Sequence, residues 1–536
     1  MLRRSFLRGA GLVAVAATVR NAWPMARPKV RFLHGVASGD PLQDSVILWT
    51  RVSSADAKPV EVEWRVAADE SMRRVVAEGR VTTDESRDYT VKVDANGLEL
   101  GSRYFYRFRC NGVDSPTGRT RTLPAGTVDA VALAVVSCSN HPAGYFHVYH
   151  EIARRDDIDA VLHLGDYLYE YGPGEYATEN AEALGRVPDP PHEMVKLADY
   201  RRRHAQYKSD PDSQAMHASA PMIAVWDDHE ITNDAWQNGA QNHQPDEGSW
   251  RERVHSALTA YFEWMPVRGE ANGGETRTFR DYRFGDLATL IMLDTRLYRR
   301  DPQPTAGDDV TPESIGEALR DPDRRLLGAE QEAWLRDRLA VAAGTTWQVI
   351  GQQIKVAGME SPDLEPVVDP DGPSRFSKQQ LIEIIDASKN HGPQFLDTWE
   401  GYPYAKADFL RDLDELGVNP VVLSGDLHTG LAADLAREPG ADPVAVELMT
   451  PAVTSPGLST YLPDRRPNGV RDATMQQNPH LRYMDIENRG WLEVALTRQR
   501  CTGTWHRVDN VIEREYSASV GQTLSVQAGR IRDGLA

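Results

Sequence analysis

The chain has 536 residues, 40% of them hydrophobic, and a formal net charge of −19 at pH 7. This length exceeds one ordinary domain, and the hydrophobic content is sufficient for a complete core. The negative charge argues against a nucleic-acid or anionic-membrane binder, because such proteins gain affinity from a basic face. An acidic protein can still bind a phosphate group if bound cations reverse the local field.

The amino terminus reads as a targeting segment over residues 1–26. Arg3 and Arg4 precede a mildly apolar run from Gly9 to Val19, a pattern typical of a twin-arginine signal. The alternatives are an ordinary secretory signal or a membrane anchor, although Arg20 directly after the run makes a spanning helix poor. We therefore expect the twin-arginine export machinery as a partner, a periplasmic or secreted protein, and no stable membrane anchor.

We predict a β-sandwich domain over residues 30–123, followed by a linker at residues 122–127. Four short segments there alternate or run apolar and are separated by turn-forming residues. They are Ser45–Val52, Val60–Ala67, Tyr89–Val93 and Tyr104–Cys110. Strands of this length and spacing are typical of a small sandwich.

From residue 130 to residue 510, strand-like runs alternate with longer polar helical segments, which predicts an α/β or layered α/β/α catalytic domain. The expected helices are Lys196–Tyr207, Trp250–Trp264, Gly328–Val341 and Tyr404–Leu416. Further expected strands are Leu287–Leu293, Thr346–Ile350, Val444–Met449 and Trp491–Leu496. Residues 174–191 and 301–327 read as long surface loops, and residues 511–536 as a C-terminal tail.

Four apolar runs are each followed directly by a motif of potential metal ligands. The motifs hold Cys138 after residues 130–136, Asp166 and Tyr169 after 159–162, Asp228 and His229 after 222–225, and Asp426 and His428 after 421–423. Ligands in open α/β sheets bind outside the carboxyl ends of the strands, so we expect these side chains to meet at one rim. Burying so many acids without a cation is costly, and the sequence therefore predicts a metal site.

The ligand types indicate two kinds of cation. The thiolate of Cys138, the phenolate of Tyr169 and the imidazole of His428 favour a transition ion, Fe(III) above all for the phenolate. The carboxylates of Asp228 and Asp426 suit a hard ion such as Ca²⁺. We therefore expect a mixed site with one pocket for each ion.

Asp166 is expected to join the two pockets, because it follows a glycine at its strand end and its carboxylate is free to bridge two cations. If the chain turns helical there, Tyr169 lies on the same face three residues later. Each residue alone also has an ordinary interpretation. Cys138 would be an inert small hydrophobe, and an aspartate at a strand end would cap the next helix.

His229 is assigned a catalytic role. Neighbouring carboxylates should favour its protonated form, which can donate a proton to the leaving oxygen; the alternative is a structural ion pair. Asn140 is the second catalytic candidate, as a neutral donor to a phosphoryl oxygen or a weak ligand. Asn233 and Asp234 are expected as further oxygen donors to a hard cation.

The chain carries no Gly-x-Ser-x-Gly elbow, no P-loop and no His-Glu-x-x-His motif. We therefore assign the nucleophile to a metal-bound hydroxide or oxo group, since a cation lowers the pKa of water from ~16 towards ~7. The three cysteines are too few for a disulfide framework, although a single Cys110–Cys501 bridge remains open.

The order of these motifs resembles the PhoD-type alkaline phosphatases. The resemblance rests on Cys138, Gly165-Asp166-x-x-Tyr169-Glu170, Trp226-Asp227-Asp228-His229-Glu230 and Gly425-Asp426-x-His428. It is supported by His34–Pro41, Leu48–Arg51, Leu293–Arg296, Leu327–Leu335 and Thr454–Gly457. The similarity extends from about Arg31 to about Val508, nearly the whole mature chain.

The resemblance implies an α/β fold, in which an immunoglobulin- or fibronectin-like sandwich precedes a four-layered α/β/β/α calcineurin-like phosphoesterase domain. It also implies one Fe(III) together with Ca²⁺. On this resemblance, the iron ligands are Cys138, Asp166, Tyr169 and His428. The calcium ligands are Asp166, Asp228 and Asp426, and His229 lies against the phosphate.

Three functions are compared. The leading hypothesis is an exported, monomeric alkaline phosphatase that hydrolyses phosphate monoesters and releases inorganic phosphate. The second is a phosphodiesterase, or a phospholipase D acting on phospholipids, at the same metal centre. The third is a secreted binding protein with a vestigial site, which the intact ligand motifs make improbable.

Overall fold

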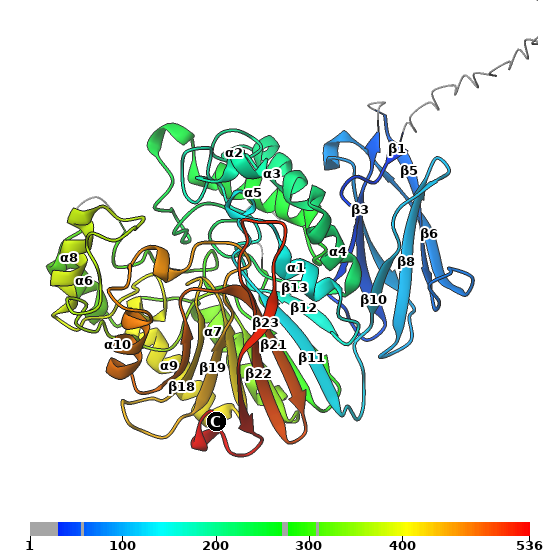
Figure 1. Ribbon diagram of the computed structural model, residues 1–536. Coiled ribbons are helices and arrows are strands. Elements are labelled where there is room, and N and C mark those ends of the chain that lie inside the picture. The colour runs from blue at the N-terminus through cyan, green and yellow to red at the C-terminus, as the bar shows by residue number, and fades with distance from the viewer. Residues whose placement is uncertain (1–29, 55–57, 271–276, 307–309) are drawn as a thin grey trace, which may run out of the picture.

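The computed structural model describes residues 30–54, 58–270, 277–306 and 310–536. The targeting segment expected over residues 1–26 lies outside them. No helix within the described ranges is long and apolar enough to cross a membrane. Strands from the N-terminal hundred residues gather on one side of the molecule, and helices α6, α8, α9 and α10 lie on the opposite side (Figure 1).

Nine strands form the largest sheet. In spatial order they are β23 (Ala518–Gln527), β22 (Arg500–Val508), β21 (Arg489–Thr497), β11 (Ala130–Val136), β12 (Ala160–His163), β13 (Met222–Ala224), β2 (Val36–Gly39), β3 (Ser45–Arg51) and β7 (Thr90–Asn96). β11, β12 and β13 pair in parallel. Their carboxyl ends therefore open onto the same edge of the sheet.

A second sheet of seven strands is largely parallel. Its order is β14 (Arg280–Phe284), β15 (Ala288–Met292), β16 (Trp347–Gly351), β17 (Pro420–Ser424), β19 (Ala445–Met449), β18 (Gly430–Leu435) and β20 (Leu481–Asp485). β15, β16, β17 and β19 run parallel. Every residue of these four strands is buried, as expected for a parallel sheet covered on both faces.

The two sheets and their helices make four layers, as the family resemblance implied. Apolar residues of both sheets, such as Leu162 and Leu423, share one core. A second core joins the nine-stranded sheet to α1 (His147–Ala153), α3 (Leu197–Ser209), α4 (Pro211–Ser219) and α5 (Trp250–Trp264). A third joins the seven-stranded sheet to α7 (Ala329–Ala342), α8 (Lys378–Ser388), α9 (Pro403–Leu416) and α10 (Gly469–Gln477).

The N-terminal strands also form two packed sheets. One contains β10 (Gly118–Arg121), β8 (Arg103–Cys110), β5 (Val60–Ala67) and β6 (Val75–Thr83), with β9 (Val113–Asp114) added to β8; two short strands, β1 (Val30–Arg31) and β4 (Ser53–Ser54), pair separately. The other is formed by β2, β3 and β7, which are the end of the nine-stranded sheet. Leu48 and Phe108 meet in the core between them.

This shared sheet is the main difference from an independent N-terminal domain. β2 pairs in parallel with β13 at Gly39 and Met222. A Cβ at Gly39 would lie 2.2 Å from the carbonyl oxygen of Pro266, so only glycine allows this approach. Next to it, buried Asp40 accepts hydrogen bonds from Arg280 at 2.9 Å and from the backbone N–H of Arg268 at 2.6 Å. These contacts hold the N-terminal strands against the rest of the molecule.

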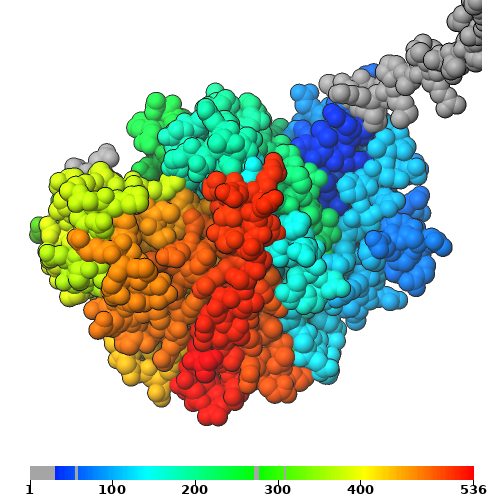
Figure 2. Space-filling model, viewed as in Figure 1, coloured from blue at the N-terminus to red at the C-terminus, as the bar shows by residue number. Residues whose placement is uncertain are grey.

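The C-terminal segment differs from the tail expected over residues 511–536. Its strand β23 pairs with β22 along nine residues, and the ring of Tyr516 stacks on His147 of α1 at 4.0 Å. In the space-filling view, the C-terminal segment (red) runs along the protein surface beside the residues that follow the N-terminal strands in the chain (cyan) (Figure 2). The segment is therefore part of the nine-stranded sheet rather than a separate tail.

Other expectations need smaller corrections. All three cysteines are free, so the Cys110–Cys501 bridge that the sequence left open is not formed. The two expected surface loops each contain a helix, α2 (Ala181–Leu184) in the first and α6 (Pro312–Arg320) in the second. α6 begins with a proline after Thr311, whose side chain accepts a hydrogen bond from the backbone N–H of Ser314 at 3.1 Å.

Candidate metal centre

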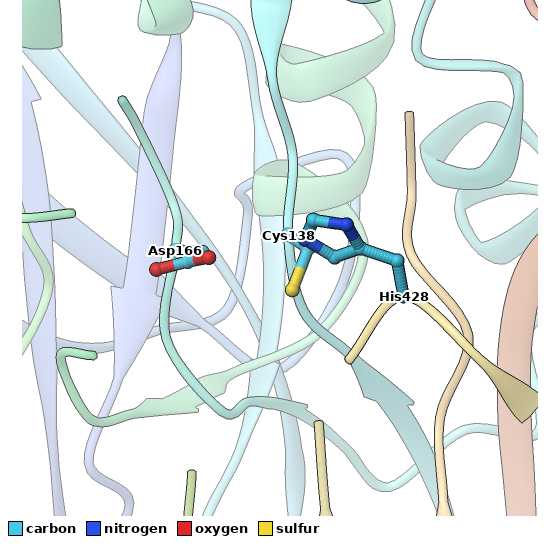
Figure 3. A group of neighbouring side chains, drawn as sticks. All are labelled: Cys138, Asp166 and His428. Atoms are coloured by element: carbon cyan, nitrogen blue, oxygen red, sulfur yellow. The ribbon is translucent and has the colours of Figure 1, made fainter. Parts of the chain in front are cut away.

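The four motifs singled out in the sequence meet at one edge of the two large sheets. They follow β11, β12 and β13 of the first sheet and β17 of the second. One ligand atom each from Cys138, Asp166 and His428 lies within 4.8 Å of the other two. Figure 3 shows these three side chains gathered from three separate segments of the chain.

Tyr169 completes this first group, although not through a helical turn. Its hydroxyl donates a hydrogen bond to Oδ2 of Asp166 at 2.8 Å and lies 3.2 Å from Nε2 of His428. Residues 166–171 are irregular rather than helical, so the expected geometry is wrong while the proximity is confirmed. The other ring nitrogen of His428, Nδ1, lies 2.9 Å from the carbonyl oxygen of Pro456. As a donor there, it leaves Nε2 unprotonated and able to bind a metal.

Several of these residues adopt a left-handed backbone. The φ angles are 60° at Cys138, 54° at Asp166, 68° at Asp426 and 52° at His428. This conformation is unfavourable for residues other than glycine, costing of order 1–3 kcal/mol each. Such strain collects where a side chain must be aimed at a functional site, and here it affects Cys138, Asp166 and His428 of the first group.

Carboxylates surround the remaining part of the centre. Three further groups could hold a cation with all donors within 4.8 Å: Asp166, Asp228 and His229; Asp227, Asp228 and Asp426; and Asp228, Asp234 and Asp397. Asp166 belongs both to this part and to the first group. Asp166 therefore lies between the first group and Asp228 and His229, and its expected role as a bridge between two cations stays a prediction.

Arg296 lies inside the carboxylate cluster. Its guanidinium pairs with Asp227 and Asp397, and its Nη2 lies 3.1 Å from Asp426 and 3.7 Å from Asp228. The side chain is fully buried. Arg296 thus offsets part of the negative charge of four carboxylates, and the buried Arg300 also pairs with Asp397.

The chemistry of the described residues fits bound metal ions. Burial, together with the neighbouring Asp227 and Asp228, raises the pKa of Asp166 and of Asp426 well above the usual range, so their ionised forms need more positive charge than the protein supplies. Oδ1 of Asp166 is buried without a hydrogen-bond partner. Burial also lowers the pKa of His428 to about 3, which leaves the imidazole neutral.

His229 is paired with a carboxylate that the sequence did not indicate. Its Nδ1 lies 2.7 Å from Oε2 of Glu170. Burial would lower the pKa of His229, but Glu170, Asp166 and Asp228 raise it well above the usual value. The adjacent Glu230 instead accepts backbone N–H groups, including that of Asp166 at 3.1 Å.

The two asparagine candidates occupy different places. Asn140 is fully buried, and both polar atoms of its amide lack a hydrogen-bond partner among the described residues. It does not line the cavity in front of the centre. Asn233 does line it, but its amide donates to Gln241 at 3.0 Å. The roles of both residues stay predictions.

A cavity of about 590 Å³ opens in front of the centre. Asp166, Asp228, His229, Asp426 and His428 line one part of it, and the rest is largely apolar. A cavity of this size can hold a drug-sized organic molecule. The centre can therefore receive a substrate directly.

Sequence reasoning missed Asp397, Arg296 and Glu170 as members of the site. Arg296 follows β15 and could have been found, because it occupies a fifth strand end. Asp397 lies in the irregular segment between α8 and α9, where no strand precedes it. Its place was visible only in the folded chain.

A four-layered α/β fold that gathers thiol, imidazole and carboxylate groups at its strand ends, in front of a cavity, has the features of a metal-dependent enzyme. A family model described as PhoD-like phosphatase matches residues 133–505. A second, described as PhoD-like phosphatase, N-terminal domain, matches residues 17–124. The chain belongs to the PhoD-like phosphatase family.

Two individual relatives agree with this assignment. Alkaline phosphatase D of Bacillus subtilis (strain 168) is 34% identical over 534 residues, covering 94% of this chain and 83% of the relative. A solved structure of PhoD superposes with a TM-score of 0.80 at 31% identity, covering 94% of this chain and 91% of the other. The resemblance inferred from the motifs is therefore confirmed.

Proposed function

We propose that this phosphatase is exported and hydrolyses phosphate monoesters, releasing inorganic phosphate. The observation that carries the proposal is the pair of adjoining ligand groups, one with thiol, phenol and imidazole and one of carboxylates, which share Asp166 and face a cavity. The phosphoryl group of the substrate would lie at this end of the cavity, against His229.

The proposed metals follow from the donor types. Cys138, Asp166, Tyr169 and His428 would hold Fe(III), because thiolate, phenolate and imidazole suit a transition ion. Asp166, Asp228 and Asp426 would hold Ca²⁺, a hard ion that prefers oxygen ligands. When bound, such cations offset the charge of the phosphoryl group and lower the pKa of coordinated water.

The protein's own residues would supply orientation and a proton. His229, with Nδ1 engaged by Glu170, has Nε2 available to donate to the oxygen of the leaving alcohol. Asn140, whose buried amide has no hydrogen-bond partner among the described residues, is proposed as a weak metal ligand or as a neutral donor to a phosphoryl oxygen. The buried Glu170 would keep the ring of His229 in a fixed orientation.

A comparison of three substrates tests the reaction class. We would assay nitrophenyl phosphate, bis-nitrophenyl phosphate and phosphatidylcholine side by side, each with added calcium and with chelator. The proposal predicts the highest kcat/KM with the monoester and loss of activity with chelator. A marked preference for the diester or the lipid would instead favour the phosphodiesterase, which the extent of the cavity beyond the ligand groups makes the second candidate.

The iron assignment can be tested by colour. Phenolate or thiolate bound to Fe(III) gives a visible charge-transfer band, which should be lost or shifted in Tyr169→Phe and Cys138→Ser. Tyr171→Phe is the matched control, because Tyr171 lines the cavity but contacts none of the four proposed iron ligands in a hydrogen bond that the structure records. A colourless, fully active zinc enzyme would contradict the assignment.

Export is proposed from the sequence of residues 1–26 and from nothing in the folded part. A double Arg3→Lys, Arg4→Lys variant should stay in the cytoplasm if the twin-arginine machinery is the partner. We also propose that the exported protein is a monomer, which light scattering of the purified enzyme would test. Secretion of the double-lysine variant at the normal rate would contradict the twin-arginine route.

A further inference from the structure

The cavity in front of the candidate metal centre has two chemically different parts. One part carries the ionisable groups, among them Asp166, His229 and His428. The other is lined mostly by hydrocarbon. Its principal side chains are Leu364, Phe376, Ile384, Phe395, Leu458 and Leu462. Hydrolysis of a phosphate ester bond requires only the ionisable groups of the first part.

The hydrophobic side chains of the apolar part pack against the protein core and together form one wall of the cavity. Phe376, Ile384, Phe395 and Leu458 pack against the core beneath the seven-stranded sheet while remaining partly exposed. The rings of Phe376 and Tyr461 lie 5.2 Å apart and join the two chain segments that form the wall. Each side chain is thus supported from behind and open towards the cavity.

Helix α8 presents two different faces here. Leu381 and Ile385 are buried in the core, and Ile384 lines the cavity. Ile382 on the same helix is 38% exposed and is not among the lining residues. The helix therefore provides a test position and a matched control of the same residue type.

The wall is continuous with the proposed ligands. Leu427 lines the cavity and stands between Asp426 and His428 in the chain. Leu458 follows Pro456, whose carbonyl oxygen lies 2.9 Å from Nδ1 of His428. A molecule with its phosphoryl group at the ligands would extend its other end along this hydrocarbon surface.

We propose that the apolar part of the cavity binds the alcohol portion of the substrate, so that the enzyme prefers phosphate esters of apolar alcohols. This inference rests on the proposed phosphatase function at the same centre. In the reaction, water supplies the oxygen that replaces the alcohol on phosphorus. The bond between phosphorus and the ester oxygen breaks, and the alcohol leaves with a proton as inorganic phosphate is released.

A chain-length series tests the inference. We would measure kcat/KM for methyl, butyl and octyl phosphate on the metal-loaded full-length enzyme, below the concentrations at which octyl phosphate forms micelles. Burial of a methylene group is worth up to about fourfold in binding. We expect kcat/KM to rise two- to fourfold for each added methylene until the apolar part is filled.

Two variants of α8 locate the effect. Ile384→Gln should lower the ratio of octyl to methyl kcat/KM at least tenfold, whereas Ile382→Gln should keep the wild-type ratio. If Ile384→Gln does not fold, Ala387→Trp serves instead, because Ala387 lines the cavity and a large ring there would exclude the longer chain.

The outcomes separate the two proposals. If methyl and octyl phosphate are hydrolysed with equal kcat/KM, the apolar-alcohol inference is wrong while the phosphatase function stands. The same holds if Ile384→Gln and Ala387→Trp leave the octyl-to-methyl ratio at the wild-type value. If none of the three esters is hydrolysed by the metal-loaded enzyme, the proposed function itself is wrong.

Discussion

Glu170 holds His229 across two loops that follow different strands, with 2.7 Å between Oε2 and Nδ1. The other carboxylate oxygen of Glu170 accepts hydrogen bonds from the backbone N–H of Asn233 at 2.8 Å and from the amide of Asn242 at 3.0 Å. Glu170 is completely buried. Both carboxylate oxygens of Glu170 are therefore held by hydrogen bonds, and Glu170 in turn fixes the orientation of the His229 imidazole, which faces the cavity.

The variant Glu170→Gln should lower kcat about 10- to 100-fold with little change in KM, because outer partners of this kind orient the group that acts. Steady-state kinetics with nitrophenyl phosphate would measure it. Glu175→Gln is the control, since Glu175 lies in the same loop but accepts from the backbone of Gly172. Equal kcat in Glu170→Gln and the wild type would contradict the positioning role of Glu170.

The variant Arg296→Met should destabilise the protein strongly. It removes a buried cation from a cluster of four carboxylates, and breaking a buried ion pair in this way costs about 3–5 kcal/mol. We expect a clear fall in the melting temperature of the chelator-treated protein. Arg299→Met is the matched control, because Arg299 lies three residues after Arg296 in the chain and is exposed. An equal fall in the melting temperature of both variants would contradict the stabilising role of Arg296.

The strand-end motifs were predictable because short apolar runs in the sequence indicate where buried parallel strands end. Cys138, Asp166, Asp228 and Asp426 each follow such a run, and the geometry of a parallel sheet brings them together. The bounds of α5 were also predictable. Ser249 caps its N terminus by accepting a hydrogen bond from the N–H of Glu252, a local signal that needs no tertiary context.

Relationships between distant parts of the chain were not predictable. Glu230 is adjacent to His229 in sequence, yet Glu170 is its partner, because side-chain direction in an irregular loop has no sequence pattern. The pairing of β2 with β13 joins residues 39 and 222 through one close approach at a glycine. β23 consists mostly of small and polar residues, with few large apolar ones. Its sequence therefore does not indicate a strand, and it joins the sheet by pairing with β22.

Calcium should raise the melting temperature by several degrees, since a ligand that binds only the folded state stabilises it by about 2.7 kcal/mol at a hundredfold excess over Kd. Asp228→Asn should abolish most of this gain, because Asp228 belongs to three of the four potential ligand groups. Scanning calorimetry with calcium, with magnesium and with chelator would measure it. Asp246→Asn, at an exposed position, should respond like the wild type, and a full calcium response in Asp228→Asn would exclude the proposed calcium site.

Glu493 of β21 gives a pH dependence of stability that is independent of the metal centre. It accepts a hydrogen bond from Arg155 at 3.0 Å, and its Oε2 lies 2.8 Å from Nε2 of His506. The bond to His506, and then the bonds and charge of Arg155, lower the pKa of Glu493 to about 2 despite partial burial. The unfolded chain has a glutamate pKa of about 4.3. The folded state therefore binds this proton less readily than the unfolded state.

The contribution of Glu493 is thus fully present above about pH 4.3 and is lost as the pH falls towards about 2. Glu493→Gln should lower the free energy of unfolding by about 1 kcal/mol at pH 7, since the pair is only partly shielded from water. The difference from the wild type should shrink between pH 4 and pH 2. Urea unfolding at pH 7, 4 and 3 would measure this, with the exposed Glu487→Gln as control. A difference that stays constant, or grows, as the pH falls would mean that the carboxylate of Glu493 does not stabilise β21 through its charge.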